Sequence, residues 1–189
     1  MPLTNARYPA KNPQWLLAGQ PSGTYRTNLD RALVVSDFAA LTTQTMQSTG
    51  LYLQAGDLVT NLTFKSGATA AATPTNWWFA LYSDDATPVL LAQTADQTTG
   101  AWAANTAKTL ALSSPVSIPR SGIYYAAVMV KAATTPSLLG AGTIAGAASG
   151  FVTGDLPLAQ NSGASLTATA PATITGASAI GFLPRVVAT

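Results

Sequence analysis

The residues best suited to chemistry lie where a predicted strand ends, at Asp84-Asp85. Paired carboxylates in a loop can ligate Ca²⁺, or can supply the two acids of a glycosidase. Adjacent side chains in a turn point apart, however, and Ala86 and Pro88 follow where an EF-hand loop would carry spaced acids. The pair is therefore predicted to form a solvated turn, and we expect no metal and no cofactor.

Aromatic residues form a second candidate site, because Trp and Tyr rings bind sugars and cations through their faces. Alternation along the strand predicted for residues 76–82 turns Trp77 toward the core. Trp78 and Tyr82 share the opposite face, which could be a ligand platform, a subunit contact or packing beneath a loop. Trp102 lies in a predicted loop. It could belong to the same interface or ligand platform, or it could pack into the end of the core.

The composition excludes several classes of enzyme. The 189 residues include no Cys and no His, and all seven acidic residues are Asp. Disulfides, zinc fingers, thiol nucleophiles and Ser-His-Asp triads are therefore excluded. Only 8% of residues are charged, against about 25% in an average soluble domain. We expect a non-enzymatic protein whose surface is largely covered by neighbouring subunits; the alternative is a secreted protein with a Thr-rich surface.

Charge and hydropathy patterning restrict the partners and the location. Nine Lys and Arg residues spread over the chain are too few for a nucleic-acid-binding face. The sequence contains no run of 18 apolar residues, so it predicts no membrane span. The segment from Met1 to Lys11 is polar and lacks the apolar region of a secretory signal. We therefore expect a protein made in the cytoplasm without a signal peptide.

Residues 1–35 are predicted to form an extended N-terminal arm. Four prolines recur within the first 21 residues, and proline favours extended backbone at its own position and the one before it. We expect this arm to lie on another subunit, with folding back onto its own domain as the alternative. Its partner-binding residues would be Arg7, Tyr8, Lys11, Trp15, Tyr25, Arg26 and Arg31.

Residues 36–189 are predicted to form one all-β domain. Turn signals recur every 8 to 12 residues between short apolar segments, which is typical of an antiparallel β-sandwich. We expect a jelly-roll-like sandwich with a Gly/Ala-rich loop at about 133–163. Residues 122–130 are apolar on both faces and predict a central strand. Residues 166–175 and 177–187 are expected to supply the last strands.

Period-two alternation gives the expected faces of individual strands. In the segment from Leu58 to Phe64, it places Leu58, Thr60, Leu62 and Phe64 on one face. The prolines at 115 and 119 bracket a segment that resembles an edge strand, where proline is tolerated.

Three motifs resemble a known family. They are Ala-Leu-Tyr at 80–82, Trp-x-x-Asn-Thr at 102–106 and Pro-x-x-Gly-x-Tyr-Tyr at 119–125. Over residues 48–135, this pattern resembles a β-sandwich module in virion proteins of tailed phages that infect actinobacteria. The resemblance implies a non-enzymatic structural protein of the virion and supplies no catalytic residues.

Two roles are compatible with this resemblance. The first is a capsid decoration (cement) protein on the capsid surface, bound to the major capsid protein and to copies of itself, with a trimer favoured. The alternative is a minor tail or receptor-binding module that contacts tail proteins or a host glycan. The second role requires an exposed aromatic platform, for which the candidates are Trp78, Tyr82 and Trp102.

Overall fold

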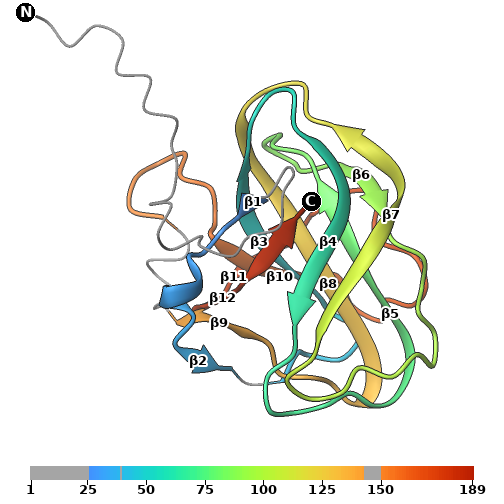
Figure 1. Ribbon diagram of the computed structural model, residues 1–189. Helices are drawn as coiled ribbons and strands as arrows, with labels where there is room; N and C mark the ends of the chain where they lie inside the picture. The colour runs from blue at the N-terminus through green and yellow to red at the C-terminus, as the bar shows by residue number, and fades with distance from the viewer. Residues whose placement is uncertain (1–25, 39, 143–149) are drawn as a thin grey trace, which may run out of the picture.

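The computed structural model describes residues 26–38, 40–142 and 150–189. The fold is all-β, with antiparallel sheets packed face to face (Figure 1), which confirms the predicted β-sandwich. Within the described ranges, the one helical element is a short 3-10 turn, η2 (Arg31–Leu33). No helix of this described part is long and apolar enough to cross a membrane.

Two large sheets and one small sheet build the sandwich. The four-stranded sheet has the order β1 (Arg26–Thr27), β13 (Val186–Ala188), β4 (Leu58–Lys65), β7 (Ala107–Ser117). The six-stranded sheet has the order β11 (Ser178–Ala179), β10 (Ala159–Ser162), β3 (Met46–Leu53), β8 (Gly122–Thr134), β5 (Ala72–Tyr82), β6 (Leu90–Gln93). The small sheet has the order β12 (Phe182–Pro184), β9 (Leu139–Gly142), β2 (Ser36–Asp37).

The main core lies between the two large sheets and is rich in aromatic rings. Trp77 and Phe79 of β5 face this core, as alternation predicts. The Trp77 ring stacks on Trp102 with centroids 5.0 Å apart, and Phe79 lies 4.8 Å from Phe64. The Trp102 indole N–H donates to the Thr106 carbonyl at 3.0 Å, so the buried ring has no unpaired donor.

The central strand is β8, which lies between β3 and β5. Its residues from Tyr124 to Val130 are all buried, and they alternate between two separate cores. Tyr124 joins the core between the sheets, and Tyr125 joins a second core on the outer face of the six-stranded sheet. The predicted central strand is confirmed, and its apolar character on both faces is explained by these two cores.

Two sequence predictions need correction, one in the inner strand β4 and one for residues 166–175. Leu58 is exposed while Val59 is buried, because the β4–β7 register shifts between Val59 and Asn61 and breaks the alternation. Residues 166–175 form no strand. They cross the outer face of the six-stranded sheet as irregular backbone, and the last strands begin at Ser178.

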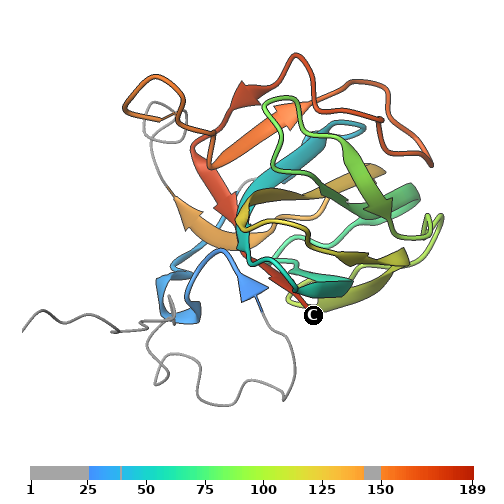
Figure 2. The same cartoon turned by 90° about the horizontal axis from the view of Figure 1, so that it is seen from above.

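The four-stranded sheet ends on one side at β7, which contains Pro115 as predicted for an edge strand. An isolated antiparallel bridge joins Leu112 of this strand to Thr94, which directly follows β6. The two large sheets therefore approach each other along this side. Figure 2 shows the sandwich from above, with η2 and the loop that precedes β10 on the side opposite β6 and β7.

The segment 163–175 is held mainly by hydrogen bonds from side chains of the strands beneath it. The Trp78 indole N–H donates to the Thr167 carbonyl at 2.7 Å, and the Tyr82 hydroxyl donates to the Pro171 carbonyl at 2.8 Å. Ala170 and Ile174 complete the outer core from above. A covering segment without strand geometry thereby pairs its backbone carbonyls with the strands that it covers.

Tyr82→Phe should destabilise the protein without changing its shape. The variant removes the part-buried hydrogen bond to the Pro171 carbonyl, which contributes about 1 kcal/mol. Urea unfolding measures the loss. Tyr52→Phe is the matched control, because this ring is 46% exposed, and its change should stay within about 0.5 kcal/mol. Equal losses for both variants would contradict the role given to the Tyr82 hydroxyl.

Candidate functional site

The second and third sequence motifs, at 102–106 and 119–125, form structural contacts in this fold. In the second motif, the backbone N–H of Asn105 donates to the Gly67 carbonyl, and Thr106 exchanges two hydrogen bonds with the Ser66 hydroxyl. In the third motif, Tyr124 donates to the Arg120 carbonyl at 2.9 Å. These contacts join loops that are far apart in the sequence, so the motif residues maintain the sandwich.

The sequence suggested an exposed aromatic platform, but the three candidate rings are buried. Trp78, Tyr82 and Trp102 are each 0% exposed. Trp78 and Tyr82 lie beneath the segment 163–175, which is the third of the three arrangements considered for them. Burial raises the pKa of the Tyr82 phenol well above its ordinary value. In the described fold, none of the three rings offers a face to a glycan.

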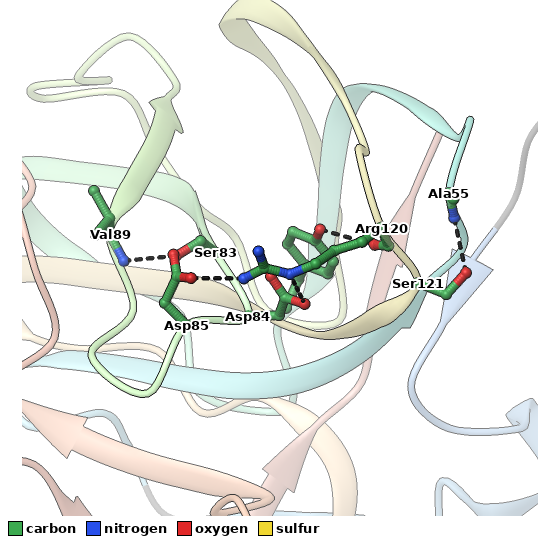
Figure 3. Close-up of polar contacts among 8 residues, drawn as sticks. Ala55, Ser83, Asp84, Asp85, Val89, Arg120 and Ser121 are labelled. Atoms are coloured by element: carbon green, nitrogen blue, oxygen red, sulfur yellow. Dashed lines mark hydrogen bonds and ion pairs between the residues drawn. The ribbon is translucent and has the colours of Figure 1, made fainter.

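The two aspartates at the end of β5 meet an arginine from the β7–β8 loop (Figure 3). Arg120 Nε lies 2.9 Å from Asp84 Oδ2, and its Nη2 lies 2.6 Å from Asp85 Oδ1. One guanidinium thus bridges both carboxylates, and the cluster keeps a net charge of −1. The sequence predicted a solvated turn here and did not predict the arginine, which is 35 residues further along the chain.

Neighbouring groups tighten this cluster. The Ser83 hydroxyl donates to Asp85 at 2.7 Å and accepts from the Val89 N–H at 2.9 Å. The Ser83 hydrogen bond and then Arg120 lower the pKa of Asp85 below its ordinary value. A Cβ built on Gly122 would lie 2.4 Å from Asp84 Oδ2, so this carboxylate occupies space that only glycine leaves free. The cluster closes one end of the sandwich.

A second ion pair, between Arg26 and Asp57, lies at the start of the described chain. Arg26 donates to both carboxylate oxygens of Asp57, at 2.7 and 2.6 Å, and to Gln54 Oε1 at 3.0 Å. Its strand β1 pairs with β13, so residues that the sequence assigned to the arm belong to the sandwich. Arg31 lies exposed in η2. The other arm residues, Arg7, Tyr8, Lys11, Trp15 and Tyr25, lie outside the described residues.

Two strongly exposed large apolar side chains of the described residues belong to the loop before β10. Phe151 is 86% exposed and Val152 is 69% exposed. Asp155 Oδ2 accepts from the backbone N–H of Phe151 at 2.7 Å and of Val152 at 3.1 Å. These two hydrogen bonds lower the pKa of Asp155 below its ordinary value. The loop is therefore closed by its own carboxylate while it presents two apolar side chains to solvent.

A preformed apolar tip of this kind is suited to protein contact. Its backbone is already ordered, so a partner that buries Phe151 gains apolar contact at a reduced entropic cost. The sequence predicted only a Gly/Ala-rich loop around these residues. The signal that could have found the tip is the sequence Gly150-Phe-Val-Thr-Gly-Asp155, in which two apolar residues precede an Asp that can close a turn.

No protein-family model matches the chain, and no curated protein matches it significantly.

Acid should open the 150–155 loop. Because backbone hydrogen bonds from Phe151 and Val152 hold the pKa of Asp155 below its ordinary value in the folded protein, the carboxylate supports the loop at higher pH and loses this role as pH falls through the lowered pKa. The NMR amide shifts of Phe151 and Val152 should titrate at a lower pH than in an unstructured peptide of the same loop sequence. In Asp155→Asn, both amides should stop titrating. A midpoint in the protein equal to or above that of the peptide would contradict the hydrogen bonding.

Proposed function

We propose that this protein is a non-enzymatic structural protein of a tailed-phage virion, and that it decorates the outer surface of the capsid. Its partners would be the major capsid protein and further copies of itself. Support comes from the three motifs between residues 80 and 125, which resemble β-sandwich modules of such virions. The low charge of 8% supports a protein that meets neighbours over much of its surface.

The observation that carries the proposal is the apolar tip formed by Phe151 and Val152. Large exposed apolar groups on a folded domain mark contact sites, and an aromatic anchor that enters a pocket supplies much of the energy of an interface. The loop that carries the tip lies on the side of the sandwich opposite β6 and β7 (Figure 2). We assign it as the anchor that enters a pocket between capsid subunits.

The mechanism that we propose is mass action. A protein that binds only the assembled shell lowers the free energy of that state relative to dissociated subunits. The decorated shell then resists heat or expansion better than the bare shell. Such a mechanism requires a complementary surface with apolar contacts, which the tip around Phe151 provides. It requires no catalytic group.

The alternative role, a glycan-binding tail module, is not supported by the residues suggested for it. That role requires exposed rings, and Trp78, Tyr82 and Trp102 are all enclosed by the fold. The same burial does not affect the decoration role, because that role uses the loop before β10.

Replacing both tip residues, Phe151→Ser with Val152→Ser, should weaken binding to undecorated shells by at least about tenfold, as expected for the loss of a buried aromatic anchor. Cosedimentation of the purified protein with such shells measures this change. Leu58→Ser is the matched control, because Leu58 is 49% exposed and lies on the four-stranded sheet. Unchanged binding by the double variant would overturn the assignment of the tip.

The location on the particle is tested separately. Gold-labelled antibody against the protein should mark the heads of intact particles in electron micrographs. Label at the tail tip would overturn the decoration role, and label on neither structure would overturn the assignment to the virion.

A further inference from the structure

Strand β2 is a sheet edge whose free side is unprotected in the described part of the chain. Three other edges carry a protecting feature: β7 contains Pro115, β12 contains Pro184, and the Leu90 N–H of β6 donates to the Ala172 carbonyl. At β2, neither a proline nor another strand of the described residues covers the side away from β9 (Figure 1). This edge is therefore open to pairing with a further strand.

The open side of β2 is formed by the backbone of Val35 and Asp37. The Phe38 N–H donates toward β9, to the Leu138 carbonyl at 3.3 Å, in the same register that pairs Ser36 with β9. Because hydrogen bonding alternates along an antiparallel strand, Val35 and Asp37 turn their N–H and C=O groups away from β9.

The side chains along this open side are apolar and exposed. Val35 is 74% exposed, and Leu33, two residues earlier, is 55% exposed. We call the surface formed by Leu33, Val35 and Asp37 the β2 edge. Apolar side chains beside unpaired backbone groups make an edge a template for pairing with another chain.

The charges at the two ends of the β2 edge are complementary to each other. Arg31 is exposed in η2, and Asp37 is exposed at the end of β2. Asp37 Oδ2 accepts from the Ala68 N–H at 2.7 Å, which holds this carboxylate in place. When two identical edges pair in antiparallel fashion, the end of one lies beside the beginning of the other. The acidic end of each copy then lies beside the basic end of its partner.

This complementarity selects one register for a pair of β2 edges. A two-fold axis at Val35 sets the two valines side by side and brings Asp37 of each copy beside the turn that carries Arg31 of the other. An axis at Asp37 would set two carboxylates opposite each other, which is destabilising. The β2 edge is thus self-complementary about Val35, as a two-fold contact requires.

We propose that two copies of this protein associate through the β2 edge, with Val35 of one copy opposite Val35 of the other. Such a two-fold contact closes at two copies, whereas the sequence favoured a trimer. The contact is small, so the dimer should be weak and should depend on concentration. It is independent of the decoration role, because it concerns the free protein and uses other elements than the Phe151 tip.

Sedimentation velocity over a range of protein concentrations measures this association. Val35→Pro should abolish the dimer, because proline removes the N–H that pairs across the axis and leaves the hydrogen bonds between β2 and β9 in place. Val35→Thr is the matched control, since it keeps the N–H and the branched side chain and should retain the dimer. Urea unfolding confirms that each variant is folded.

A charge change tests the register. Arg31→Glu should weaken the dimer several-fold, because it sets a second negative group beside Asp37 of the other copy. Lys65→Glu makes the same charge change at an exposed position of the four-stranded sheet and should leave the dimer unchanged. Equal effects of the two variants would contradict the register.

Amide hydrogen exchange at Val35 and Asp37 identifies the occupant of the edge. Protection of these amides should rise with protein concentration. Protection that does not depend on concentration would assign the edge to a segment of the same chain and overturn the dimer. A protein that stays monomeric, a trimer, or a dimer that survives Val35→Pro would overturn it as well. No particle is present in these experiments, so their failure leaves the decoration role to its own test.

Discussion

The structure depends on one constraint: the six-stranded sheet has to be buried on both faces. Strand β8 is apolar on each side, and it sends Tyr124 into the core between the sheets and Tyr125 into the outer core. The four-stranded sheet covers the inner face. On the outer face, the segment 163–175 takes the place of a further sheet, so its irregular backbone is as necessary to the fold as any strand.

That cover forms no continuous ladder, although an isolated bridge joins its Thr173 to Val89. The aromatic residues beneath it therefore carry a second role. Tyr125 donates to the Pro157 carbonyl at 2.8 Å, as Trp78 and Tyr82 donate to the covering segment. Burial raises the pKa of Tyr125 to about 12, so this donor keeps its proton throughout the neutral range. Each ring fills volume and at the same time satisfies a carbonyl that no strand could reach.

The architecture could be predicted from the sequence where alternation is regular, and much less of the candidate site could be. The strand around Trp77 and the central strand follow from apolar periodicity. The exposed Leu58 does not, because a register shift in a paired strand is invisible in the strand itself. The burial of Trp78 depends on a segment 89 residues away, and the partner of Asp84 depends on a loop 36 residues away. Such contacts are properties of the fold and have no local signal.

The edge strand β7 has a consequence for the protein at high concentration. An open strand edge invites pairing with the edge of another molecule and can lead to fibrils. Pro115 removes one backbone donor from this edge, and the bridge from Leu112 to Thr94 draws the strand toward β6. Both features oppose pairing of β7 with the edge of another molecule, which is of use to a chain with only 8% charged residues.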